Sequence, residues 1–160
     1  GHRSGKPRAF LMPLAYADTS YLVSLYVQDA NSERAVAAVR SLLPLALTPI
    51  ARHELRNAIR LCVFRRQITS SQRTSVFDNI ESDLSSGVLL TTPVDWSKIL
   101  ARAESLSREA SEEIGTRCMD IVHVAAALTL RCRRFATFDD RQAQLAVRAG
   151  LDVVTLAGSG

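Results

Sequence analysis

The sequence predicts an α/β fold, a three-layer sandwich in which a central, mainly parallel β-sheet is flanked by helices. Short apolar runs typical of buried strands alternate with longer segments whose apolar residues recur at helical spacing. Such alternation is typical of parallel sheets, because a crossover helix returns the chain to the start of the next strand. The length of 160 residues fits one domain, and a hydrophobic content of 47% is enough to fill a core.

The predicted strands are short, and helices follow most of them directly. The first strand ends at Asp18, and Thr19 or Ser20 is suited to cap the helix that follows. The expected strands are residues 14–17, 45–48, 88–91, 134–137 and 152–156.

The predicted helices are bounded by residues that favour helix ends. Pro44 ends the second helix, Pro49 suits the first turn of the third, and Gly87, Gly115 and Gly150 stop three later ones. The expected helices are residues 19–26, 31–43, 49–66, 71–85, 94–112, 120–131 and 140–149.

The start of the chain differs from the rest. We expect residues 1–13 to form a basic tail outside a single domain of residues 14–157, and because an expression tag leaves a similar start, the tail is excluded from the fold argument. Without Arg3, Lys6 and Arg8, the 20 basic residues fall to 17 against 16 acidic ones, so the net charge falls from +4 to +1. A charge so close to zero does not mark a nucleic-acid binder, and any such function must rest on a local site.

The cysteines and the apolar runs indicate a cytoplasmic protein. Cys62, Cys118 and Cys132 are odd in number, widely spaced and without metal-ligand spacing, so we expect reduced thiols. No apolar run approaches the roughly 20 residues of a membrane span. No signal peptide is evident, and we expect no membrane partner.

Glu54 lies on the apolar face of a predicted helix. At about 100° per residue, the arginines of helix 49–66 gather on the opposite side. A buried charge is costly unless it is paired or bound to a cation, so Glu54 is a candidate ligand or the partner of an arginine from elsewhere. The apolar face comprises Ile50, Ala51, Leu55, Ala58, Leu61 and Cys62, and the basic stripe comprises Arg52, Arg56 and Arg60, which we interpret as a solvated face.

Asp120 begins a predicted helix that is apolar on nearly every side. Backbone N–H groups at a helix start stabilise a carboxylate, so Asp120 is either a simple N-cap or a functional acid. His123 follows one turn later, and we interpret it as a hydrogen-bonded core histidine rather than a ligand.

Asp18 and Asp139 each follow a predicted strand. Ligand sites of open α/β sheets gather at the carboxyl ends of the strands, and the starts of the helices that carry Glu54 and Asp120 can reach the same edge. Two charges about 4 Å apart repel by roughly 4 kcal/mol at an effective dielectric of 20, so four clustered carboxylates need a cation. All-oxygen ligands suit Mg²⁺ or Mn²⁺, and such an ion favours phosphodiester cleavage.

Four fragments of the chain resemble the PIN-domain nucleases, and within them the VapC-type toxins of bacterial toxin–antitoxin pairs. They are YADTSYLV at residues 16–23, HELRNA at 53–58, RCMDIVHVAA at 117–126 and ATFDDRQ at 136–142, and residues 146–154 resemble the family's last helix and strand. The resemblance implies that Asp18, Glu54, Asp120 and Asp139 are the catalytic, metal-binding acids.

The same resemblance implies smaller roles for the neighbours of these acids. Ser20 or Thr19 would orient Asp18, and Thr137 would orient Asp139, which fits the Thr-x-Asp pattern better than Asp140 does. The family further implies Mg²⁺ or Mn²⁺, a homodimer, structured RNA as substrate and a cognate antitoxin protein as inhibitor. Arg117 is a candidate phosphate contact, and helices within residues 19–43 are a candidate groove for an antitoxin helix.

Other functions fit the sequence less well. A phosphotransferase of the haloacid-dehalogenase type needs a second acid where Ser20 stands, and a receiver domain needs a late lysine, whereas the only lysine after Lys6 is Lys98. A Rossmann module would need a glycine-rich loop after the first strand. Two alternatives stay open: a PIN-like RNA-processing nuclease without an antitoxin, and a catalytically silent binding module.

Overall fold

Five short strands form one sheet in the computed structural model, which describes residues 12–154. The strand order is β3-β2-β1-β4-β5, and every pairing is parallel, so the predicted sheet is confirmed. Residues 1–11 of the predicted tail and residues 155–157 of the predicted domain lie outside the described residues. The strands are β1 (Ala15–Ala17), β2 (Leu45–Leu47), β3 (Leu89–Thr91), β4 (Arg134–Ala136) and β5 (Asp152–Val153).

The helices match the predicted ones, with shifts of a few residues at their ends. The shift that matters for the acids is at α6, which begins at Cys118 and not at Asp120 as predicted. Asp120 therefore lies within the first turn of this helix. They are α1 (Thr19–Tyr26), α2 (Ser32–Val39), the short 3₁₀ helix η1 (Arg40–Leu42), α3 (Pro49–Phe64), α4 (Ser70–Ser86), α5 (Trp96–Ile114), α6 (Cys118–Thr129) and α7 (Asp140–Arg148).

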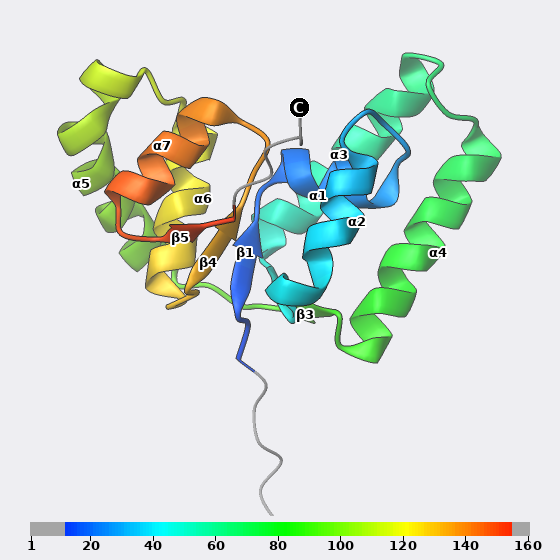
Figure 1. Cartoon of the computed structure of the whole chain (residues 1–160), viewed down its shortest axis with the longest axis horizontal. Coiled ribbons are helices and arrows are strands. Elements are labelled where there is room, and N and C mark those ends of the chain that lie inside the picture. Colours follow the sequence, from blue (N-terminus) through cyan, green and yellow to red (C-terminus); the bar gives the residue numbers. More distant parts are fainter. Residues whose placement is uncertain (1–11, 155–160) are drawn as a thin grey trace, which may run out of the picture.

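The sheet separates two hydrophobic cores, and the alternation of side chains along each strand decides which residue enters which core. Ala15 and Ala17 of β1 belong to the core that α1–α4 cover, whereas Tyr16 belongs to the core under α5–α7. Figure 1 shows the resulting three layers, with α1–α4 on one side of the sheet and α5–α7 on the other. The predicted three-layer sandwich is therefore confirmed.

Three strands pass directly into helices through a capping side chain. Asp18 accepts a hydrogen bond from the backbone of α1, Thr48 caps α3, and Asp139 caps α7. Because the strands are parallel, these three caps lie at the same edge of the sheet. Short polar residues at this edge are therefore required by the fold, whatever else they do.

The connections reverse direction around β1. From β1 the chain moves outward to β2 and β3, and then returns to place β4 and β5 on the other side of β1. The helices that follow β1 and β4 consequently cover opposite faces, and the carboxyl ends of these two strands form the point at which open α/β sheets usually bind ligands. The Asp18 N–H, which donates to the Ala136 carbonyl over 3.0 Å, lies at this point.

The cysteines and the lengths of the helices agree with the sequence-based expectations within the described residues. Cys62, Cys118 and Cys132 are free thiols, as predicted. Within residues 12–154, no helix combines the length and the apolar character that crossing a membrane requires.

Replacing Leu55, which is fully buried on α3, tests the core between this helix and the sheet. We expect Leu55→Ala to lower the free energy of unfolding by about 2–5 kcal/mol, because the lost side chain leaves a cavity among packed neighbours. Leu61→Ala on the same helix is the matched control, since this leucine is 38% exposed and its loss should cost about 1 kcal/mol or less. Urea denaturation measures both; equal losses would contradict the assigned core.

Candidate active site

Asp18 is a buried carboxylate held by three hydrogen bonds. Only 3% of the residue is exposed, and its oxygens accept from the Ser20 hydroxyl (2.7 Å), the Tyr21 N–H (2.9 Å) and the Thr137 hydroxyl (2.5 Å). None of the ion pairs in the described part of the chain includes Asp18. Burial raises the pKa of Asp18, although these three hydrogen bonds oppose the rise.

The two hydroxyl groups on Asp18 also join the β1–α1 and β4–α7 turns. Ser20 Oγ accepts from the Phe138 N–H (3.1 Å), and Thr137 Oγ1 accepts from the Asp139 N–H (2.9 Å). Of the two predicted neighbours, Ser20 therefore orients Asp18, whereas the Thr19 hydroxyl is buried with no hydrogen-bond partner among the described residues. Thr137 holds Asp18 and the backbone of Asp139, not the Asp139 carboxylate that it was expected to orient.

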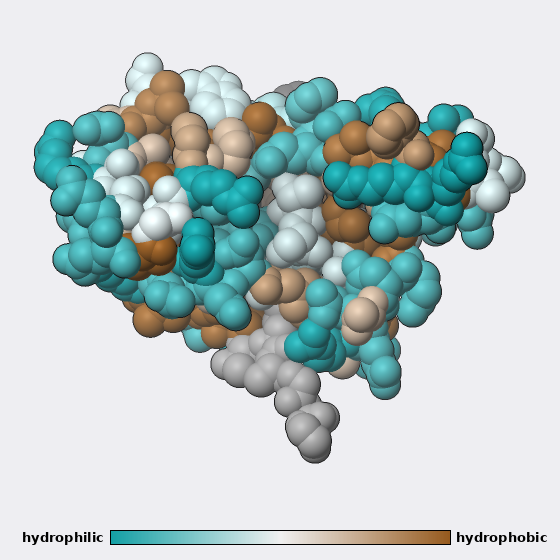
Figure 2. All heavy atoms as spheres, turned by 90° about the horizontal axis from the view of Figure 1, so that it is seen from above, coloured by the Kyte–Doolittle hydropathy of each residue, from teal (hydrophilic) through white to brown (hydrophobic). Residues whose placement is uncertain are grey.

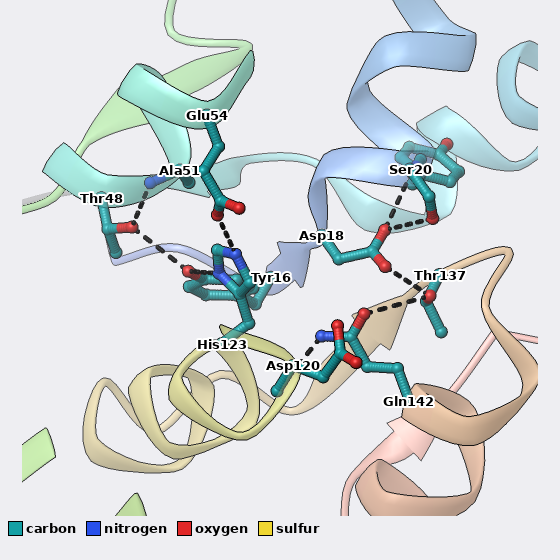
Figure 3. Close-up of polar contacts among 11 residues, drawn as sticks. Tyr16, Asp18, Ser20, Thr48, Ala51, Glu54, Asp120, His123, Thr137 and Gln142 are labelled. Atoms are coloured by element: carbon teal, nitrogen blue, oxygen red, sulfur yellow. Dashed lines mark hydrogen bonds and ion pairs between the residues drawn. The ribbon is translucent and has the colours of Figure 1, made fainter. Parts of the chain in front are cut away.

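Asp120 is the third residue of α6, so the interpretation of this residue as an N-cap is wrong. Arg117 occupies the N-cap position, and Asp120 lies in the first turn, where the helix dipole favours a negative charge. The Gln142 side chain donates to the backbone carbonyl of Asp120 over 3.2 Å, but the Asp120 carboxylate has no hydrogen-bond partner within the described residues. In Figure 3 this carboxylate points into the space that Asp18 also faces.

Glu54 contacts His123 and, within residues 12–154, forms no ion pair with an arginine. His123 Nε2 bonds Glu54 Oε1, and His123 Nδ1 lies 2.6 Å from the Tyr16 hydroxyl. The alternative of an arginine partner for Glu54 is therefore wrong, and His123, which is 3% exposed, is the hydrogen-bonded core histidine that we expected. The Glu54 side chain is 27% exposed, so it lies at the border of the core rather than inside it.

Asp139 is tied to the start of α7. Its Oδ1 accepts from the Gln142 N–H over 2.9 Å, and the residue is half-buried. It lines a cavity of about 400 Å³ together with Asn31 and Arg34. The structure thus brings Asp18, Glu54 and Asp120 around one space (Figure 3), and it connects Asp139 to Asp18 through Thr137.

One protein family matches most of this sequence. The family model described as the PIN domain matches residues 15–148, which is most of the chain. The chain belongs to the PIN domain family. The resemblance seen in the sequence fragments is thereby confirmed, and with it the fold. A comparison with curated protein sequences finds no match.

Solved structures agree with the PIN fold. FitAcB of Neisseria gonorrhoeae superposes with a TM-score of 0.64 at 22% identity, covering 89% of this chain and 97% of that one. VapC20 of Mycobacterium tuberculosis, described as a sarcin–ricin loop cleaving toxin, gives 0.59 at 17% identity, covering 81% and 93%. A toxin–antitoxin complex from Klebsiella pneumoniae gives 0.59 at 18% identity, covering 89% and 98%. At such identities the likeness shows the fold alone.

Three polar residues of this PIN domain were missed by the sequence argument as contributors to the site. The Tyr16 hydroxyl forms hydrogen bonds with His123 and with Thr48, and Gln142 connects α7 to α6. A signal existed for Gln142, because it shares the buried face of α7 with Leu145 and Ala146, where a polar side chain needs a partner. Tyr16 gave no such signal, since tyrosine is common in strands.

The arginines divide into two groups. Arg52 and Arg56 pair with Glu81 of α4, and Arg56 and Arg60 lie over the Phe77 ring, so the stripe on α3 contacts α4. It does so at the surface, as the solvated-face interpretation expects, since Arg60 is exposed and the Arg52 side chain is 43% exposed. Arg117 is exposed three residues before Asp120 and has no partner among residues 12–154. It therefore stays a candidate for a phosphate contact.

The donor set of this PIN domain fits a hard divalent cation. Asp18 and Asp120 offer carboxylate oxygens without a compensating positive charge, which is the chemistry Mg²⁺ and Mn²⁺ prefer. Within the described residues, no three Asp, Glu, His or Cys side chains are close enough together to hold one ion. This spacing suits Mg²⁺, which keeps several water ligands and binds through one or two carboxylates.

Asp18→Asn tests the cost of the buried charge. Because burial raises the pKa of Asp18, the ionised carboxylate destabilises the folded protein above the pKa of the unfolded chain. In EDTA at pH 7 we expect the variant to be more stable by about 1 kcal/mol, or roughly 2–4 °C in Tm. The gain should shrink as the pH falls and disappear below 3.8, where the carboxyl group is mostly protonated in both the folded and the unfolded state.

Thermal melts followed by circular dichroism between pH 4 and pH 8 measure this effect. The exposed Asp140, in the first turn of α7, provides the matched control Asp140→Asn, which should change Tm little across the same range. A drop in Tm of Asp18→Asn at pH 7 would mean that its three hydrogen bonds outweigh the cost of burial.

Proposed function

We propose that this PIN domain is a metal-dependent endoribonuclease and the toxin of a type II toxin–antitoxin pair. The observation that carries the proposal is the Asp18 carboxylate, which is buried and has no ion-pair partner within the described residues. It faces Asp120 and Glu54 at the carboxyl ends of β1 and β4. Membership of the PIN family supports the nuclease. The toxin role is supported by the likeness of the fold to VapC20, a sarcin–ricin loop cleaving toxin, and to the toxin–antitoxin complex from Klebsiella pneumoniae.

In the proposed site each acid has a different support. Asp18 is held in one orientation by Ser20 and Thr137, and Asp120 is presented by the first turn of α6. Glu54 is held by His123, and Asp139 borders the site from α7. We propose that these four acids are the catalytic set and that they hold Mg²⁺ or Mn²⁺, no more than two of them contacting one ion directly, because no three of them lie close enough together within the described residues.

The chemistry that such an ion supplies is activation of a water molecule and neutralisation of charge on the phosphate. The protein's own part is to fix the ligand oxygens in advance, which the hydrogen bonds on Asp18 do. Without the cation, the carboxylates repel the negatively charged RNA backbone. Arg117, exposed beside the start of α6, is the residue we propose for binding a substrate phosphate.

The proposed partners are RNA, a cognate antitoxin protein and a second copy of this chain, and the proposed location is the cytoplasm. A cavity of about 600 Å³ lies between α1 and α3, lined in part by Val23, Val27 and Leu61, and it suits an amphipathic antitoxin helix. Figure 2 shows hydrophobic side chains exposed on the α1–α4 side, where Phe64 is 82% exposed. Such exposure on a monomer favours a binding surface.

Asp120→Asn tests the nuclease. Purified protein should cleave RNA with Mg²⁺ or Mn²⁺ and stop on addition of EDTA, and the variant should lose at least about 100-fold in cleavage rate because a ligand oxygen and its charge are removed. Asp140→Asn on α7 is the matched control and should cleave normally, as this exposed residue has no place in the proposed set. Gel analysis of a labelled structured RNA measures the rates.

Unchanged cleavage by a folded Asp120→Asn protein would contradict the proposed site. A wild-type protein that is folded and binds Mn²⁺ but cuts no RNA would instead favour the silent binding module. Induced expression distinguishes the toxin from an RNA-processing enzyme: the toxin should arrest bacterial growth, and the product of a neighbouring short gene should relieve the arrest. Growth unaffected by wild-type expression would contradict the toxin role.

A further inference from the structure

A closed set of hydrogen bonds surrounds Glu54, and the proposed nuclease mechanism does not yet use it. Thr48, Tyr16, His123 and Glu54, here called the polar network, are connected in that order. Thr48 and Glu54 belong to the same helix, α3, as its N-cap and a residue in its second turn, so the network begins and ends on one rigid element. Figure 3 shows the Glu54 and Tyr16 side chains pointing towards the His123 ring, with Thr48 beside Tyr16.

The Glu54 carboxylate decides the direction of the bond that holds it. A carboxylate oxygen only accepts, so His123 Nε2 carries a proton and donates it to Glu54 Oε1. On the other side of the ring, His123 Nδ1 shares a hydrogen bond with the Tyr16 hydroxyl. The Tyr16 hydroxyl also shares a hydrogen bond with Thr48 Oγ1 over 3.2 Å, in which either oxygen can donate, and Thr48 Oγ1 accepts from the Ala51 N–H (3.2 Å).

Packing prevents His123 from binding a metal ion or contacting RNA. Its ring is 3% exposed and lies against Tyr16, with ring centroids 5.6 Å apart, while Tyr16 is stacked on Phe135 of β4. Both ring nitrogens are already hydrogen-bonded within the protein. His123 therefore has no lone pair for a metal ion and no path to an RNA phosphate.

The bond from His123 uses only one of the two Glu54 oxygens. Figure 3 shows the other oxygen on the side of the space that Asp18 faces. A glutamate has three rotatable bonds before its carboxylate, and holding one oxygen removes most of that freedom. Fixing a ligand carboxylate in this way is how hydrogen-bonded neighbours raise metal affinity.

From these observations we propose that Tyr16 and His123 are positioning residues, which hold Glu54 with one oxygen turned towards the metal site beside Asp18. The proposal rests on the proposed function, since it assigns a role towards the metal of that site. It gives a role to two residues that the acidic set does not include. Tyr16 also links the two halves of the site, because it lies on β1 only two residues before Asp18.

Binding of Mn²⁺ to EDTA-stripped protein tests the proposal, with free Mn²⁺ measured by electron paramagnetic resonance. We expect Tyr16→Phe and His123→Leu to weaken binding about 10- to 100-fold, the usual effect of losing a group that orients a ligand. His123→Gln should recover part of the loss, since its amide N–H can replace the Nε2 donor. Tyr26→Phe is the matched control, because it removes a tyrosine hydroxyl that bonds Asp83 on the other side of the sheet.

A second measurement separates positioning from catalysis. At saturating Mn²⁺, Tyr16→Phe should cleave RNA at nearly the wild-type maximal rate, because only the metal concentration needed for activity has shifted. Circular dichroism melts of every variant confirm folding, and Tyr16→Phe keeps the ring packing even where His123→Leu does not fold.

Each other outcome is decisive. Wild-type Mn²⁺ binding that persists unchanged in both Tyr16→Phe and His123→Leu overturns the positioning role and leaves the proposed nuclease intact. Equal weakening in Tyr26→Phe also overturns it, because the effect would then be general. A wild-type protein that binds no Mn²⁺ overturns both the positioning role and the metal-dependent function.

Discussion

The structure depends on one costly arrangement, a carboxylate enclosed between the first and the fourth strands. Asp18 is nearly inaccessible to water and has no cationic partner among the described residues, so three hydrogen bonds carry the whole burden of stabilising it. Those donors come from the β1–α1 turn and from Thr137 of the β4–α7 turn. The two turns are also joined directly, because the Phe138 N–H donates to Ser20 Oγ. The two turns therefore keep a fixed relative position, because both donate hydrogen bonds to the same carboxylate.

The helices around Asp18 show how stability and function share residues. Thr48 and Asp139 are caps that the fold needs wherever parallel strands give way to helices, and the same edge collects the acids. Glu54 and Asp120 stand on helices whose other faces are buried, so their backbones cannot move far. A rigid scaffold that presents unpaired oxygens suits an ion better than a flexible one, since little ordering remains to be done on binding.

The polar network extends this logic from the caps to the interior of the protein. It passes through Tyr16 and His123, both buried in the core under α5–α7, whereas most of α3 packs on the opposite face of the sheet. The edge of the sheet is the place where these two cores meet. A site at that edge can be held from both sides, which a site on one face cannot.

The sequence by itself determined the features that depend on local periodicity and on capping residues. The strand and helix order, the parallel sheet, and the positions of Asp18 and Asp139 after strands follow from apolar spacing and polar punctuation, and the family resemblance follows from short fragments. Only the tertiary structure decided which partner each acid has. That Glu54 meets His123 rather than an arginine, and that Thr137 holds Asp18, depends on distances between segments far apart in the chain. Periodicity records which face of an element is buried, but it carries no information about which side chain of another element lies opposite.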